Sequence, residues 1–363
     1  MREVDLVYRT MFADLCERVM DASFESDLDL SGRFVPVEVK GRRYWYFDQT
    51  VDGTSRRTYV GPAADEEITR RVEDFRNLKN DRRARRKLVS TLVRGAGFPQ
   101  PESMTGDIVA ALAKAGLFKL RGVLVGTVAF QCLGGVLGVR LPSAVMRSAD
   151  GGTAKLHTIS AAVGESLPPV QDVLRAVDSS FRAVSHGPGG RVSMQFASDT
   201  GYTVELLMLD DEEDHFGDAP APPAMFLDFL VREPVRSVLL HRSGVPVAIP
   251  APERFAVHRI LEAACLYRDA VGCAEVSNDL HQAAALASAL ETVRRHGDLA
   301  MAWSEAWDRG PAWREALETG ISYMQPKLRN ALERTLENGL EEIDADPAEY
   351  GLTSDMGTPV PRM

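Results

Sequence analysis

A glycine–threonine pair, Gly126–Thr127, stands between a short aliphatic run, Val123–Val125, and residues that favour a helix. The run is typical of a buried strand because its residues are aliphatic and mostly β-branched. A strand that turns into a helix at such a pair presents backbone N–H groups and a hydroxyl group to the space above the turn. The spacing therefore predicts a binding site for an anion such as a phosphate group.

Two carboxylates accompany this turn. Asp150 is the lone acidic residue of its stretch, and Glu205 lies between Val204 and Leu206 in an apolar run that predicts a strand. An acidic side chain in a hydrophobic strand is costly unless it meets a cation or a hydrogen-bond partner. Glu205 is therefore a candidate metal ligand, and the alternative is an edge-strand glutamate that faces solvent.

Several segments resemble a known family. Residues 122–132 and 135–147, then an acidic position and the pattern A-x-x-H-x-I-S at 154–160, resemble the polymerase-β-like nucleotidyltransferase superfamily and, within it, a bacterial family with a minimal nucleotidyltransferase fold. The resemblance implies that Gly126 and Thr127 hold the phosphates of a nucleoside triphosphate. It also implies that Asp150 and Glu205 are the catalytic carboxylates and bind Mg²⁺.

The chain departs from the family at one acidic position. The family pattern reads T-G-D-x-D-x-A, whereas residues 148–154 read S-A-D-G-G-T-A, so that Gly152 stands where the second carboxylate belongs. Two Mg²⁺ ions need several carboxylates because Mg²⁺ prefers hard oxygen ligands. We therefore expect a chain that binds Mg²⁺·NTP and whose transfer activity is impaired.

A further match opens at residue 251 and resembles the family pattern P-x-P-x-R-F-A-x-H-K-L. The lysine of that pattern, which the resemblance assigns to the nucleotide phosphates, is Arg259 in this chain. Arginine keeps the charge but replaces a compact ammonium group by a planar fork. A K-D-L motif is expected further on, and there Asp279 is retained while the lysine is replaced by Asn278.

The elements that must position these residues are those of an α+β fold. We expect a mixed sheet of the nucleotidyltransferase fold with flanking helices, preceded by an N-terminal helix and a small β-sheet and followed by a helical C-terminal region. Glycine- and proline-rich breaks suggest five parts: 1–62 with the N-terminal helix and small sheet, 63–100 with a long basic helix and linker, 101–250 with the nucleotidyltransferase-fold domain, 251–345 with the helical C-terminal domain, and 346–363 as a flexible tail.

Aromatic and basic residues gather in the expected small sheet: Arg42, Arg43, Tyr44, Trp45, Tyr46, Arg56, Arg57 and Tyr59. They are the ingredients of a nucleic-acid platform, and the alternative is a small sheet with one aromatic face buried and solvated charges outside. The run Lys79–Lys87 on the helix that follows is either a solvated helix face or a phosphate-backbone contact. Through residues 79–87, tRNA or another nucleic acid is a candidate partner.

Composition restricts the remaining possibilities. The 363 residues carry a net charge of −10, so a nucleic acid has to be met by a local basic patch. The four cysteines form no C-x-x-C motif, which favours neither a zinc site nor a disulfide framework. The charged N-terminus lacks a signal-peptide core and no apolar run is long enough to span a bilayer, so we expect a soluble cytoplasmic protein. The acidic run Asp210–Asp214 is interpreted as a solvated loop, and the C-terminal tryptophans as core.

Three functions follow from these observations. The first is a nucleotidyltransferase that uses Mg²⁺ and an NTP to modify an RNA, a protein or a small molecule, with tRNA suggested by toxin-like members of the superfamily. The second is a nucleotide-binding regulator of weak catalytic power. The third is a nucleic-acid-binding protein in which the small sheet and the basic helix act and the central domain is a scaffold.

Overall fold

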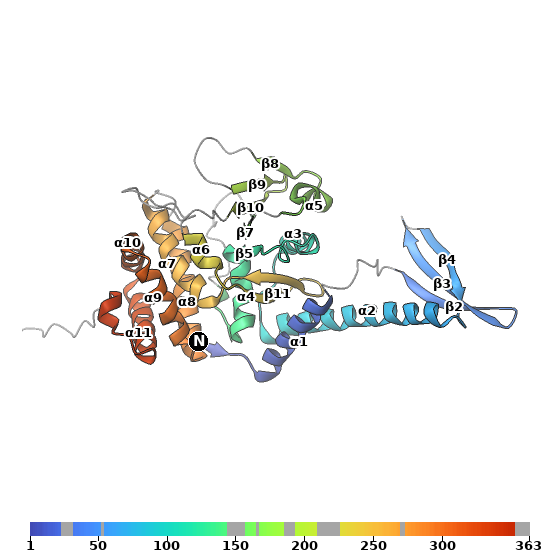
Figure 1. Ribbon diagram of the computed structural model, residues 1–363, viewed down its shortest axis with the longest axis horizontal. Coiled ribbons are helices and arrows are strands. Elements are labelled where there is room, and N and C mark those ends of the chain that lie inside the picture. The colour runs from blue at the N-terminus through green and yellow to red at the C-terminus, as the bar shows by residue number, and fades with distance from the viewer. Residues whose placement is uncertain are drawn as a thin grey trace, which may run out of the picture.

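The computed structural model covers residues 1–363 and describes residues 1–22, 32–51, 54–143, 157–164, 167–184, 193–208, 226–268 and 273–352. A long helix projects from a globular body and carries a small sheet at its far end, while helices gather at the opposite end of the molecule (Figure 1). The expected α+β class, with a small N-terminal sheet and a helical C-terminal region, is confirmed.

The N-terminal region comprises β1 (Arg2–Glu3), α1 (Leu6–Ala22), β2 (Arg33–Val39), β3 (Arg42–Val51), β4 (Thr54–Pro62), α2 (Glu66–Thr91) and the π-helical turn η1 (Leu92–Ala96). Helix α2 begins at Asp65, whose carboxylate accepts hydrogen bonds from the N–H groups of Glu67 and Ile68, as an N-cap does. Its 26 residues correspond to a rod of about 39 Å. Strands β2, β3 and β4 form an antiparallel sheet in chain order.

The central region comprises α3 (Ser103–Lys114), β5 (Val123–Val125), α4 (Gly126–Leu137), β6 (Val139–Arg140), β7 (His157–Val163), α5 (Val170–Val177), β8 (Arg182–Val184), β9 (Ser193–Ala197), β10 (Tyr202–Met208), α6 (Leu227–Val231), β11 (Val235–Leu239) and β12 (Val245–Ile249). Five of these strands form a mixed sheet in the order β5-β7-β10-β9-β8. Among the strand pairs of the described residues in this sheet, β7 and β10 are the parallel pair and the others are antiparallel. Strands β1 and β6, and strands β11 and β12, form two further antiparallel pairs.

The C-terminal region comprises α7 (Pro252–Arg268), α8 (Cys273–Thr292), α9 (His296–Asp308), α10 (Pro311–Ser322), α11 (Pro326–Glu342) and the short 3₁₀ helix η4 (Pro347–Tyr350). Trp303, Trp307 and Trp313 are buried, which confirms their interpretation as core. One hydrophobic core extends from Ile108 to Leu352 and joins the mixed sheet to these helices. The domain boundaries expected from the sequence remain a prediction.

A second hydrophobic cluster fixes the base of α2 to the body. Phe12, Leu15 and Val19 of α1 pack in it with Val89 of α2 and Val238 of β11. The sheet β2-β3-β4 is attached to the other end of α2, where the rings of Phe34 and Phe47 contact the ring of Phe75. The basic stretch 79–87 therefore lies between the small sheet and the body (Figure 1).

Candidate functional site

The turn at Gly126 joins β5 directly to α4. Gly126 has a φ of +70°, and a Cβ atom built on it would meet nothing within 4 Å. The residue before it, Val125, is extended and provides no side-chain cap for α4. The first N–H groups of an α-helix have no acceptor within the helix, and the position where a side chain of residue 126 would begin is open among the described residues. This geometry suits a phosphate group.

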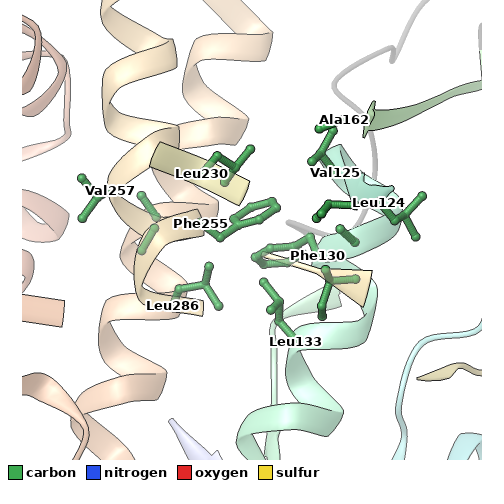
Figure 2. Close-up of a cluster of buried hydrophobic side chains, with 14 of the residues drawn as sticks. Leu124, Val125, Phe130, Leu133, Ala162, Leu230, Phe255, Val257 and Leu286 are labelled. Carbon is green, nitrogen blue, oxygen red and sulfur yellow. The ribbon is translucent and has the colours of Figure 1, made fainter. Parts of the chain in front are cut away.

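Tight packing holds α4 in place behind the turn. Phe130 is fully buried, and its ring lies 5.7 Å from the ring of Phe255 on α7. Figure 2 shows these two rings facing each other, with Leu133 of α4 and Leu286 of α8 beside them. Gly135 allows the ring of Phe12 to approach α4 more closely than any side chain with a Cβ would permit. The helix that follows the Gly126 turn is therefore packed closely in the core.

Polar residues run across the sheet next to this turn. Val125 pairs with Ser160 of β7, Ser160 pairs with Glu205 of β10, and Glu205 pairs with Gln195 of β9. Directly paired residues share a face of a sheet, so Ser160, Glu205 and Gln195 form one polar stripe, and all three are half-buried. Two strand spacings separate Val125 from Glu205, a distance of about 10 Å. The structure thus brings Glu205 close to the Gly126–Thr127 turn.

The position of β10 settles one alternative. Because β10 lies between β7 and β9, the interpretation of Glu205 as an edge-strand residue is wrong. The opposite face of the same strands is apolar: Ile159, Val204 and Leu206 are almost completely buried. A strand with one buried face and one polar face produces the alternation seen around Glu205.

Asp150 and Gly152 lie outside the described residues, as does the acidic run Asp210–Asp214. Their assignment to the site therefore stays a prediction from the sequence. Since β5 and β7 are antiparallel with Val125 opposite Ser160, β7 begins at the end of the sheet where β5 ends. The chain enters β7 at His157, seven positions after Asp150.

Two more carboxylates lie at this end of the sheet, Asp199 in the β9–β10 turn and Asp178 at the end of α5, and protein groups already bind both. Asp178 accepts hydrogen bonds from the hydroxyl groups of Ser180 and Thr200, at 2.7 and 2.9 Å. These hydrogen bonds, with that of Ser180 first, lower the pKa of Asp178. Asp199 accepts a hydrogen bond from Arg182 at 2.6 Å. Both carboxylates support the turn.

Oxygen atoms of the polar stripe have the chemistry that Mg²⁺ prefers. The carboxylate of Glu205, the hydroxyl of Ser160 and the amide oxygen of Gln195 are hard donors. Within the described parts of the chain, no group of three or more His, Cys, Asp or Glu residues is arranged to hold a metal ion. The donor set of the stripe fits Mg²⁺, with one carboxylate from the described residues.

Arg259 lies elsewhere, in the contact between α7 and α8. Its guanidinium group is buried and pairs with Glu262 at 2.5 Å and with Asp279 at 3.1 Å. It also lies over the ring of Phe255, 4.7 Å from the centroid. Burial alone would lower the pKa of Arg259, but the two carboxylates outweigh it and raise that pKa. Two carboxylates therefore already balance the charge that the resemblance assigns to phosphate.

His258, next to Arg259, is buried as well. Its Nδ1 lies 3.7 Å from a carboxylate oxygen of Glu262. Burial lowers the pKa of His258 to about 4 against the attraction of Glu262, so the imidazole is neutral at neutral pH. The sequence motif R-F-A-x-H did not indicate that His258 is buried beside Glu262. The pairing of Arg259 with Asp279 was likewise hidden because the two residues lie on different helices.

The chain is thus an α+β protein in which a strand–turn–helix lies beside a polar stripe of a mixed sheet. A family model described as Nucleotidyltransferase matches residues 103–308, from the first residue of α3 to the last residue of α9. The match spans more than half of the chain, which therefore belongs to this nucleotidyltransferase family and confirms the resemblance. Searches of curated proteins and of solved structures gave no match. Among the helices of the described ranges, none has the length and apolar character needed to cross a membrane.

Proposed function

We propose that the chain binds Mg²⁺·NTP at the Gly126–Thr127 turn and transfers the nucleotidyl group slowly to an acceptor. The observation that carries this proposal is the open turn, with Glu205 two strands away. In nucleotidyl transfer an acceptor oxygen attacks the α-phosphorus, and the bond to the leaving pyrophosphate breaks. Negative charge grows on the phosphate oxygens, so the reaction needs cations and fixed N–H donors around them.

Each residue has a separate task in this proposal. The N–H groups at the start of α4 and the hydroxyl of Thr127 hold the terminal phosphates. Glu205 and Asp150 hold Mg²⁺, which when bound neutralises phosphate charge. Ser160 and Gln195 orient the carboxylate of Glu205 from the neighbouring strands. Arg259 reaches a phosphate group only if its ion pairs with Glu262 and Asp279 open. Its buried Nε has no acceptor among the described residues, so this atom is the donor that a phosphate oxygen would satisfy.

The substitution Gly126→Ala tests the turn. The added methyl group meets no protein atom but occupies the space assigned to phosphate, and we expect NTP affinity to fall at least tenfold, about 1.4 kcal/mol. Backbone strain at positive φ costs about 1–2 kcal/mol of stability. Isothermal titration calorimetry with Mg²⁺ and each NTP measures the affinity.

Gly116→Ala is the matched control for this test. Gly116 also has a positive φ, +91°, and open surroundings, but it precedes β5 whereas Gly126 follows it. We expect a similar loss of stability with unchanged NTP affinity. Equal affinity of the unsubstituted chain in EDTA, or no effect of Gly126→Ala, would contradict metal-dependent binding at this turn.

The second proposed function is nucleic-acid binding by the N-terminal arm, residues 32–94. The arm contains 16 Lys and Arg residues and 9 Asp and Glu residues, a net charge of +7 in a chain whose total is −10. Within the basic stretch, Lys79 donates to the carbonyl oxygen of Gly32, and Arg85 pairs with Asp81. Arg83, Arg86 and Lys87 are exposed and are the side chains available to phosphate groups.

We expect the double charge reversal Arg83→Glu with Arg86→Glu to weaken RNA binding and to reduce the slope of log K against log salt by about 2. The control is Lys327→Glu with Arg334→Glu, which reverses two exposed charges on α11. Fluorescence anisotropy of labelled tRNA at several salt concentrations measures the binding constant and its salt slope for each variant. If the control lowers affinity as much as the test variant, the effect is one of net charge, and α2 holds no specific site.

A further inference from the structure

The small sheet has two faces of different character. The face toward α2 buries Trp45 and packs Phe34 and Phe47 against Phe75. The indole N–H of Trp45 donates to the hydroxyl of Thr69 at 3.1 Å. This face therefore accounts for the attachment of the sheet to its helix. The remaining aromatic residues of the sheet have no part in that attachment.

Three tyrosines lie on the other face, which we call the tyrosine face. The ring of Tyr59 lies 5.5 Å from the ring of Tyr46 and 6.0 Å from that of Tyr44. Tyr59 is 54% exposed, and the other two rings are half-buried. A cluster of rings that is open to solvent leaves apolar area uncovered, which is costly unless a partner uses it.

An irregularity in the sheet creates this cluster. Trp45 pairs with Gly61, but Tyr46 pairs with Tyr59, so that Val60 is an extra residue in β4. In a regular ladder Tyr59 would pair with Phe47 and face α2, because side chains alternate along a strand. The bulge at Val60 turns Tyr59 to the outer face instead. Bulges of this kind commonly re-aim side chains at functional surfaces.

Basic side chains surround the tyrosine face. Arg42 precedes Tyr44 by two positions on β3 and therefore lies on the same face, as do Arg33 and Arg57, which pair with Asp48, two positions after Tyr46. All three arginines are exposed, and the carboxylate of Asp48 forms ion pairs with Arg33 and Arg57. Val39, 43% exposed, extends the apolar area beside Arg42. The face belongs to an arm with a net charge of +7, so its partner is expected to be a polyanion.

We propose that the tyrosine face binds single-stranded nucleic acid, with bases stacked on Tyr44, Tyr46 and Tyr59. Unpaired bases offer flat apolar surfaces together with phosphate charge. The ring cluster around the exposed Tyr59 matches the first, and the exposed basic residues match the second. A duplex hides its base faces and offers only phosphate. An acidic protein surface matches the charge but does not supply flat rings.

Binding at the tyrosine face depends on the proposed nucleic-acid binding by α2 only in so far as the basic residues of α2 attract the strand. The basic stretch of α2 lies between the small sheet and the body (Figure 1). A strand bound to the face is therefore attracted along α2 toward the body. Specificity for single strands comes from the tyrosines, whereas the salt dependence comes from the arginines and lysines.

The test measures fluorescence anisotropy of labelled 20-nucleotide oligo-U and oligo-dT, with a 20-base-pair duplex for comparison, using the full chain in EDTA without NTP. We expect single strands to bind at least tenfold more tightly than the duplex. Tyr59→Ala should weaken single-strand binding about tenfold and leave the salt slope unchanged. Tyr59→Phe, which retains the ring, should stay within about twofold of the unsubstituted chain.

Thr58→Ala is the matched control, since Thr58 is exposed and lies next to Tyr59 in β4 but pairs with Phe47 on the other face. Binding by Thr58→Ala should be unchanged. Equal binding of duplex and single strand, or an unchanged affinity in Tyr59→Ala, overturns the proposal. If the chain binds neither oligo-U nor oligo-dT, the proposal is also overturned, and a protein is then the expected partner of the tyrosine face. Because the assay contains neither metal nor NTP, its result is independent of nucleotidyl transfer.

Discussion

Gly152→Asp is expected to raise the rate of nucleotidyl transfer by at least about a hundredfold, which corresponds to about 2.7 kcal/mol of activation free energy. In the family pattern D-x-D the two carboxylates are one residue apart, a spacing that places both on one face of an extended strand. The chain retains Asp150 and has Gly152 at the second position. The substitution restores a carboxylate where the family uses one to hold metal.

The described part of the sheet begins shortly after this position. Residue 152 is five positions before His157, where β7 begins at the end of the sheet that carries the Gly126 turn. Glu205, on the strand next to β7, provides a carboxylate two strand spacings, about 10 Å, from Val125. A transfer assay with labelled NTPs, Mg²⁺ and total RNA compares the two chains at matched concentrations. The variant Gly151→Asp, which adds the same charge one position away, is the control.

A fast reaction by the unsubstituted chain, with no gain from Gly152→Asp, would contradict the assignment of the acidic motif. Another carboxylate would then complete the site, and Asp199 and Asp210 are the candidates. Asp199 already accepts a hydrogen bond from Arg182, so its use as a metal ligand would require that pair to separate. Asp199→Asn distinguishes this possibility, because it should abolish activity only if Asp199 binds the metal.

The second large effect concerns the stability of the α7–α8 contact. We expect Arg259→Met to lower the free energy of unfolding by about 3–5 kcal/mol, the cost of removing one partner from a buried ion pair. Glu262 and Asp279 would lose the cation between them while remaining in a largely buried setting. Urea denaturation followed by circular dichroism measures the change.

A second variant separates charge from packing. Combining Arg259→Met with Asp279→Asn also removes one of the two carboxylates that lost their cation. We expect this double variant to regain a substantial part of the free energy of unfolding lost in Arg259→Met. Arg329→Met is the matched control, because Arg329 forms an exposed pair with Glu333, and exposed pairs contribute about 0–1 kcal/mol. A loss below about 1 kcal/mol in Arg259→Met would contradict a structural role and favour an arginine that is free to meet phosphate.

Local sequence determined the parts of this protein whose geometry depends on neighbouring residues. The run Val123–Val125 followed by Gly126–Thr127 predicted a strand, a turn and a helix, since a short aliphatic run and a glycine at positive φ are local properties. The long basic helix expected within residues 63–100 is α2, Glu66–Thr91. The family pattern in the central region could be recognised because its motifs are also short local stretches of sequence.

Tertiary structure decided which of these parts meet. The sequence indicated Glu205 as a candidate but did not indicate the residues beside it in the sheet. The pairing of β10 with β7 and β9 joins residues that are far apart in the chain. The same applies to Arg259, whose partner Asp279 lies on the next helix, and to Tyr59, which a single extra residue turns to the outer face. Such outcomes depend on strand register and helix packing, and these are set by burial across the whole core.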